Sequence, residues 1–137
     1  MIGYSMKDPK WGNLEIDHSG HKMSTHGCLV DSLSMLFQKT PDVVLKALND
    51  HNCFDQQGDL IWTKMLKVIG LTTYQYISGN TPVLSITKPI IAETDHFAYE
   101  DYPQHFFLAL TDGMIIDSLD GKTKKNPYKI VSLRYVA

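Results

Sequence analysis

The sequence predicts an α+β fold, because its first half carries apolar residues at helical spacing and its second half carries short strand-forming runs. With 137 residues, of which 43% are hydrophobic, the chain has the size of one domain and can bury a core without disulfides. It contains no internal repeat, low-complexity tract or linker. We therefore predict a single domain over residues 1–137.

Three helices are predicted in the first half. The first spans residues 28–38, where apolar side chains recur at the spacing of one helix face. The second begins at Pro41, with Thr40 as its N-cap, since proline suits the first helical position. The third spans residues 60–69 and ends at Gly70, which suits a C-cap.

Beyond Gly70 the sequence changes to short runs rich in β-branched and aromatic residues. The predicted strands span residues 72–77, 82–87, 89–92, 105–110, 114–117 and 128–135. Residues 93–104 are acidic, aromatic and irregular, which predicts a loop over one end of the sheet. The first 27 residues show no sustained periodicity, so we expect an extended arm and a loop there.

The candidate nucleophile is Cys28, which opens the first predicted helix. A helix N-terminus carries partial positive charge and free N–H groups, and these favour the thiolate that attacks carbonyl carbon. Downstream, His105 begins one predicted strand and Asp117 ends the next. The order cysteine, histidine, aspartate suggests a nucleophile, a base and the group that orients the base.

The turn near Gly113 decides whether His105 and Asp117 meet. A two-residue turn places their side chains on opposite faces of the sheet. A three-residue turn over residues 111–113, with Gly113 in the left-handed conformation, pairs Phe107 with Asp117. His105 and Asp117 are then diagonal neighbours on one face. The sequence permits both turns.

Each of these residues also has a structural interpretation. Cys28 is equally consistent with a small buried hydrophobic residue, His105 with a histidine bonded to backbone, and Asp117 with a turn former. Cys53 lies in a polar loop and has no predicted role. His96 is a second, weaker candidate for the base, because no strand-forming run follows it.

A zinc site is an alternative, because His18, His21, His26 and Cys28 fall within eleven residues. Structural zinc sites usually use two separated ligand pairs, and no second pair is near. We therefore predict no metal. Without a glycine-rich phosphate loop, we also predict no cofactor.

The net charge of −2, from 13 basic and 15 acidic residues, provides no basic field, so nucleic-acid binding is not predicted. Two cysteines are too few for a disulfide scaffold, which favours a reducing compartment. No run resembles a signal peptide or a membrane span, so we expect neither export nor membrane anchoring.

Nearly the whole chain resembles the C39-like peptidase domains of the papain-like superfamily, found in bacteriophage and bacterial proteins. The most specific matches are the Gly27-Cys28 helix start and the Ile-Asp-x-x-Asp-Gly segment at residues 116–121. The matching segments are residues 4–12, 26–36, 40–42, 60–62, 105–108 and 115–122. The resemblance implies a papain-like fold with helices packed on an antiparallel sheet. It also implies Cys28 as nucleophile, His105 as general base and Asp117 as the residue that orients the imidazole.

One position departs from the family. Relatives usually have glutamine where this chain has Met6, and that glutamine is thought to help form the oxyanion hole. A thioether donates no hydrogen bond, and loss of one oxyanion donor typically costs about 10²–10³ in turnover. His21, Lys22 and His26 are the alternative donors that the sequence offers.

Three classes of function follow. The first is a thiol peptidase or amidase that cleaves a peptide, isopeptide or peptidoglycan stem-peptide bond. The second is a module that binds a peptide or cell-wall fragment without cleaving it, for example in a virion. The third is a phage-encoded modifier or inhibitor of a host protein. We expect a cytoplasmic location, including that of a phage-infected host, or association with a virion, and a host or virion protein as partner.

Overall fold

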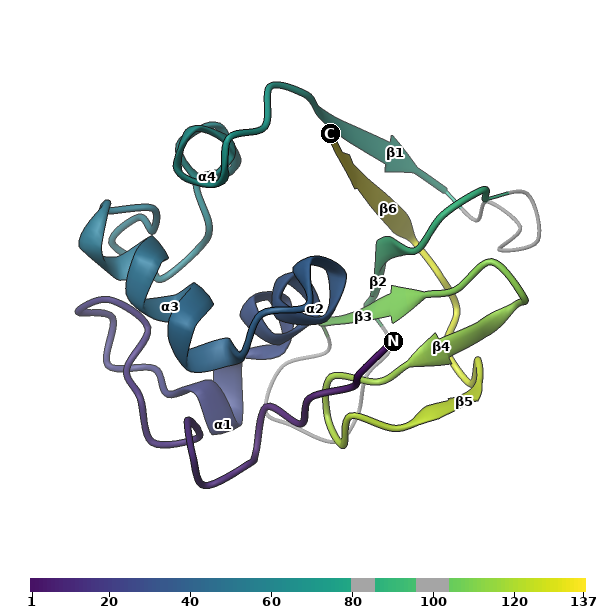
Figure 1. The fold of residues 1–137 in the computed structure, drawn as a ribbon, viewed down its shortest axis with the longest axis horizontal. Coiled ribbons are helices and arrows are strands. Elements are labelled where there is room, and N and C mark those ends of the chain that lie inside the picture. The colour runs from purple at the N-terminus through teal and green to yellow at the C-terminus, as the bar shows by residue number, and fades with distance from the viewer. Residues whose placement is uncertain (80–85, 96–103) are drawn as a thin grey trace.

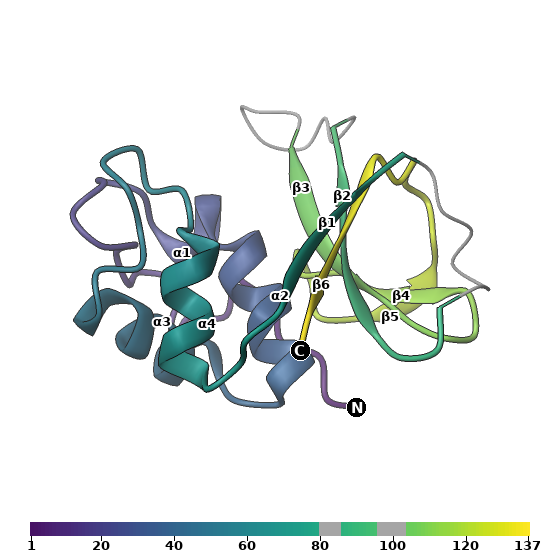
Figure 2. The ribbon, with the colours of Figure 1, turned by 90° about the horizontal axis from the view of Figure 1, so that it is seen from above.

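The computed structural model describes residues 1–79, 86–95 and 104–137, and within them it is an α+β fold, as predicted. The helices are α1 (Met23–His26), α2 (Cys28–Phe37), α3 (Pro41–Asp50) and α4 (Trp62–Ile69). The strands are β1 (Tyr74–Ser78), β2 (Ile90–Thr94), β3 (His105–Ala109), β4 (Met114–Ile116), β5 (Thr123–Lys125) and β6 (Ser132–Val136). The helices lie together on one side and the strands on the other (Figures 1 and 2).

The described strands form one six-stranded sheet in the order β1-β6-β2-β3-β4-β5, and every neighbouring pair is antiparallel. β2 and β3 occupy its centre, and all their described residues are buried. Figure 2 shows α2 between the sheet and the pair α3 and α4. α2 is therefore the helix that joins the two halves of the molecule, and it packs on β3.

Three helices agree closely with their predicted positions. α2 begins at Cys28 and ends at Phe37, and the C-cap residue Gln38 follows it in the left-handed conformation with a φ of 53°. Thr40 is the N-cap residue of α3, although its side chain makes no capping hydrogen bond. Gly70 ends α4 with a φ of 75°, which glycine adopts without steric cost.

Two elements were not predicted. α1 lies where the sequence predicted an arm and loop, because a helix of four residues with one buried side chain, Met23, has no readable periodicity. β5 was missed because it is an edge strand of Thr-Lys-Lys, and lysine on an edge discourages pairing with other chains.

Other boundaries also differ from the prediction. Glu93 and Thr94 were predicted to lie in a loop, but they extend β2, since buried Glu93 forms an ion pair with Arg134. The last strand begins at Ser132 rather than at residue 128. Of the strand predicted at residues 82–87, the first four residues lie outside the described part and the last two are not in a strand.

The sheet separates two apolar clusters. One fills the space between the sheet and the helices, and α2 supplies Cys28, Val30, Leu33 and Met35 to it. The other covers the opposite face of the sheet, where Phe107, Ala109 and Ile115 pack with Ile130 and Tyr128. Alternate residues of β3 enter opposite clusters, so both faces of this strand are fixed by packing.

The N-terminal arm is tied to both halves. The backbone of Ile2 exchanges two hydrogen bonds with the Gln38 side chain, at 2.9 and 3.0 Å. The N–H of Met6 donates to the carbonyl of Ser118 at 2.8 Å. Gly3 lies so close to Gly121 that an added Cβ would stand 2.0 Å from its carbonyl oxygen. The arm therefore holds the segment that follows β4.

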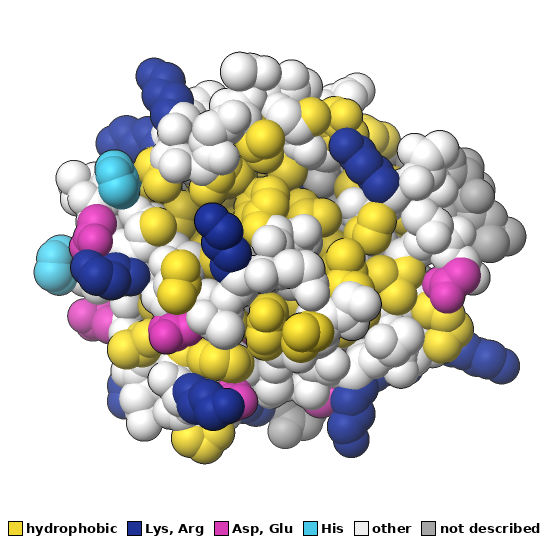
Figure 3. Space-filling model, viewed as in Figure 1, with side chains coloured by type: hydrophobic (Ala, Val, Ile, Leu, Met, Phe, Trp, Pro, Cys, Tyr) yellow, Lys and Arg dark blue, Asp and Glu magenta, His cyan; other side chains and the backbone are white. Residues whose placement is uncertain are grey.

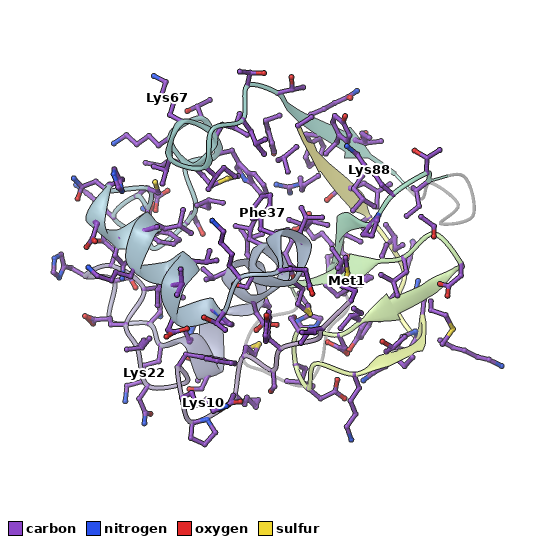
Figure 4. The ribbon with its side chains drawn as sticks, in the orientation of Figure 1. Met1, Lys10, Lys22, Phe37, Lys67 and Lys88 are labelled. Atoms are coloured by element: carbon purple, nitrogen blue, oxygen red, sulfur yellow. The ribbon has the colours of Figure 1, made fainter. Side chains whose placement is uncertain are left out.

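On the face of Figure 3, lysine and arginine side chains are distributed both within and around a central apolar area. In Figure 4, Lys10, Lys22, Lys67 and Lys88 occupy separate positions. No helix among the described residues is long and apolar enough to cross a membrane.

Candidate active site

The connection between β3 and β4 is the three-residue turn. Leu108 pairs with Ile116 and Ala109 with Ile115, and the N–H of Leu110 donates to the carbonyl of Met114 at 2.9 Å. Gly113 has a φ of 85°. This register continues to a pairing of Phe107 with residue 117, one of the two arrangements that the sequence permits.

His105 and Asp117 therefore meet. His105 is the first residue of β3, and Asp117 follows β4 directly. Nε2 of His105 lies 2.8 Å from Oδ1 of Asp117, and the two side chains are only 2% and 1% exposed. The N–H of Leu119 also donates to Oδ1, at 3.0 Å. The carboxylate is thus held against the imidazole in a site that excludes water.

Cys28 completes the arrangement from the helical half. It is the first residue of α2 and 4% exposed, and its thiol is free. The Cys28 side chain is hydrogen-bonded to the ring of His105. The first N–H groups of a helix have no intrahelical acceptor, so they surround the sulfur with positive potential. The structure thus brings together the nucleophile, base and orienting residue that the sequence predicted.

The charges of the site reinforce one another. Burial lowers the pKa of His105, but hydrogen bonds and charge interactions with Asp117 and Cys28 outweigh burial and raise it to about 9. Burial raises the pKa of Asp117, but hydrogen bonds from His105, Tyr128 and Leu119 outweigh it and lower it to about 2. At neutral pH the imidazole is a cation, and a cation beside sulfur favours the thiolate.

A third acid lies beside this array. Asp31 is one helical turn beyond Cys28, it is fully buried, and neither carboxyl oxygen has a hydrogen-bond partner among the described residues. Its pKa is raised well above the ordinary value by burial, and further by the negative charges of Cys28 and Asp117. The pKa of Asp31 is therefore shifted upward by its surroundings, whereas that of Asp117 is lowered.

A cavity of about 330 Å³ opens beside Cys28. Its walls are mostly apolar, and polar side chains line the remainder. The lining residues are Ile16, His21, His26, Cys28, Leu29, Val30, Phe54, Gln57, Gly58, Asp59, Leu60, Gln104 and Phe106. This volume lies at the lower end of ligand pockets and suits one side chain of a larger substrate.

The four predicted oxyanion-region residues are in different places. His21 and His26 line the cavity, and their rings stack with centroids 3.9 Å apart. Lys22 is exposed at the N-cap of α1 and does not line the cavity. Met6 is buried in the core and 1% exposed. The histidines therefore remain side-chain candidates for a donor beside Cys28.

The alternative sites are not supported by this geometry. Among the described residues, no three His, Cys, Asp or Glu side chains are grouped so that they could hold a metal ion. Cys53 is fully buried, and burial raises the pKa of its thiol despite the opposing charge of Lys64. His96, the second candidate base, lies outside the described part of the chain.

Sequence reasoning missed two side chains that contact Asp117. The hydroxyl of Tyr128 donates to Oδ2 of Asp117 at 2.5 Å, and the ammonium of Lys124 lies 3.5 Å from the same oxygen. Both residues lie in the lysine-rich stretch of residues 122–129, at whose end Tyr128 was predicted to begin a strand. Only the fold of β4 and β5 brings this stretch back to Asp117.

Comparison of the chain with protein-family models, with curated proteins and with solved structures finds no match.

The His105–Asp117 pair predicts a pH-dependent stability. Because folding raises the pKa of His105 from 6.5 to about 9, its stabilising contribution is complete below pH 6.5 and lost as pH rises through 9. We expect the free energy of unfolding to fall by roughly 3 kcal/mol over this interval. Urea unfolding measures it, and Asp117→Asn should greatly reduce the fall. The charge assignment is contradicted if the free energy of unfolding of the wild type does not change over this interval, or if it falls as steeply in Asp117→Asn as in the wild type.

Asp31 predicts a second loss of stability with rising pH, of the same sign but starting at lower pH. A raised carboxyl pKa means that stability declines as pH rises above the ordinary value of 3.8. Asp31→Asn removes this linkage, and we expect it to raise the free energy of unfolding at neutral pH by about 1–3 kcal/mol. The control is Asp50→Asn, because Asp50 is exposed at the end of α3 and its ion pair with Lys46 is worth at most about 1 kcal/mol. A destabilised Asp31→Asn would mean that the charged carboxylate is required.

Proposed function

We propose that this protein is a thiol-dependent peptidase or amidase of papain-like architecture. Its substrate is a peptide, isopeptide or peptidoglycan stem-peptide bond, cleaved through a thioester on Cys28. The observation that carries the proposal is the contact of Cys28 at the start of a helix with the buried pair of His105 and Asp117. Cys28 also lines the cavity, which is the side from which we propose that the substrate approaches.

The first half of the reaction transfers the acyl group. The thiolate of Cys28 attacks the carbonyl carbon and forms a tetrahedral oxyanion. His105, a cation at neutral pH, then gives its proton to the leaving nitrogen, the C–N bond breaks, and the amine departs. Asp117 keeps the imidazole oriented and stabilises its positive charge throughout.

The second half hydrolyses the thioester. His105 is now neutral and takes a proton from water, and the resulting hydroxide adds to the carbonyl carbon. The C–S bond breaks, the carboxylic acid leaves, and thiolate and imidazolium are restored. The raised pKa of His105 favours this restored state at neutral pH.

Stabilisation of the oxyanion is the weakest part of this site. The backbone N–H of Cys28, at the first position of α2, is one donor that the helix leaves without an intrahelical acceptor. The side chain of Met6 supplies none. This deficit favours a slow enzyme, and it is also the observation that favours the second candidate, a module that binds a peptide, a cell-wall fragment or a host protein without cleaving it.

Thiol labelling tests the nucleophile. We expect iodoacetamide at neutral pH to label Cys28 at least about tenfold faster than Cys53, because only Cys28 combines a helix N-terminus with a neighbouring imidazolium. Mass spectrometry of timed digests gives both rates in one sample. His105→Ala should slow the labelling of Cys28, whereas His51→Ala on the exposed end of α3 should not. Equal rates, or faster labelling of Cys53, would remove Cys28 as nucleophile.

Met6→Gln tests the missing donor. If the site lacks one oxyanion donor, a glutamine amide should raise turnover of stem peptides or of a general peptide library by up to about 100-fold. The increase should disappear in Met6→Gln with Cys28→Ala, and unfolding curves show whether the core accepts the change at this buried position. Unchanged activity would assign the donor to His21 or His26. Binding without cleavage in every variant would establish the binding module.

A further inference from the structure

Tyr128 contacts the candidate site on the side of Asp117 away from Nε2 of His105. Oδ1 of Asp117 accepts hydrogen bonds from His105 and from the N–H of Leu119, at 2.8 and 3.0 Å. Oδ2 accepts the hydroxyl of Tyr128 at 2.5 Å. Each carboxylate oxygen therefore has its own donors, and the plane of the carboxylate is fixed by bonds on both sides.

The other group near Oδ2 holds it less firmly. The ammonium of Lys124 lies 3.5 Å from Oδ2 but only 2.7 Å from Asp120, and its side chain is 33% exposed. Tyr128 forms the shorter bond from a partly buried position. Burial and donation to Asp117 both raise the pKa of Tyr128, so its hydroxyl keeps the proton that it donates.

The ring of Tyr128 has a second contact with the site. It packs edge-on against the imidazole of His105, with centroids 5.4 Å apart and planes at 65°. It also packs on Phe107, at 5.0 Å. The ring thus covers the imidazole from the face of the sheet opposite the helices, where it belongs to the second apolar cluster.

We propose that Tyr128 is a positioning residue of the candidate site, whose hydroxyl fixes the Asp117 carboxylate against His105 while its ring shields their hydrogen bond from water. This role rests on the proposed function, since it assigns Tyr128 a part in keeping the base oriented for Cys28. It acts through Asp117.

Removing the hydroxyl alone should have two consequences. Oδ2 loses its short hydrogen bond, which stabilises the ionised carboxylate, so protons bind Asp117 more readily. The carboxylate also becomes free to rotate away from the imidazole. The titratable groups that interact with Asp117 are His105 on β3, Tyr128, Lys124 on β5 and Asp31 on α2. Cys28 lies beside His105, and Asp120 pairs with Lys124.

The test compares Tyr128→Phe with wild type and with Tyr135→Phe. Tyr135, on β6, is the matched control, because its hydroxyl accepts a hydrogen bond from Lys88 rather than bonding to Asp117. NMR of the carboxyl carbon follows the titration of Asp117. We expect Tyr128→Phe to raise the proton affinity of Asp117 by about tenfold to a hundredfold, and Tyr135→Phe to leave it unchanged.

Acid unfolding provides an independent reading. Ionised Asp117 stabilises the fold until pH falls through its pKa of about 2. The midpoint of acid unfolding should therefore move to higher pH in Tyr128→Phe and not in Tyr135→Phe. A variant that keeps the wild-type titration of Asp117 and the wild-type acid midpoint overturns the proposal.

Turnover separates positioning from general structural support. In Tyr128→Phe we expect kcat to fall about tenfold with little change in KM, because the base is misplaced while the substrate cavity is intact. Tyr128→Leu, which also removes the ring cover, should lose more. If the wild type cleaves no substrate but Tyr128→Phe still raises the proton affinity of Asp117, the proposed function is wrong, whereas the positioning of Asp117 by Tyr128 is supported. If wild type cleaves and Tyr128→Phe changes neither Asp117 nor kcat, only the positioning role fails.

Discussion

The hydrogen bond between His105 and Asp117 is the interaction on which the candidate site depends. It joins the start of β3 to the residue after β4 in a place where neither side chain meets water. Because the pair is buried, its charges interact strongly, and the imidazole keeps its proton at neutral pH. The sulfur of Cys28 thereby gains a fixed cation as neighbour. Without this bond the cysteine is a small apolar residue at the end of a helix.

Charge balance constrains the rest of the site. One buried imidazolium can balance only a small number of negative charges. Asp117 and Cys28 interact with His105 directly, and Asp31 interacts with both of them. The structure resolves this by giving the acids different surroundings. Asp117 has donors on both oxygens, and these lower its pKa to about 2, whereas Asp31 has no hydrogen-bond partner among the described residues, and burial raises its pKa. The pKa values of the two aspartates thus move in opposite directions because their surroundings differ.

Much of this arrangement is predictable from the sequence. Apolar spacing located α2, and Gly70 located the end of α4, because these signals are local. The sequence permits both a two-residue and a three-residue turn at Gly113, because the Asp112-Gly113 pair suits either one. Tertiary packing selects one: Ile116 enters the cluster facing the helices and Ile115 the opposite one, and a slip by one residue would exchange them. Tyr128 was not predictable, because no local pattern links it to Asp117.

The most direct test of the central claim is the ultraviolet absorbance of the thiolate at neutral pH, measured as the difference between wild type and Cys28→Ser. An imidazolium held by Asp117 beside the sulfur predicts a thiolate signal from Cys28 at neutral pH, and predicts that Asp117→Ala removes most of it. Cys53 is present in every sample and cancels in the difference. A wild type without this absorbance would contradict the ion pair and, with it, the assignment of Cys28 as an activated nucleophile.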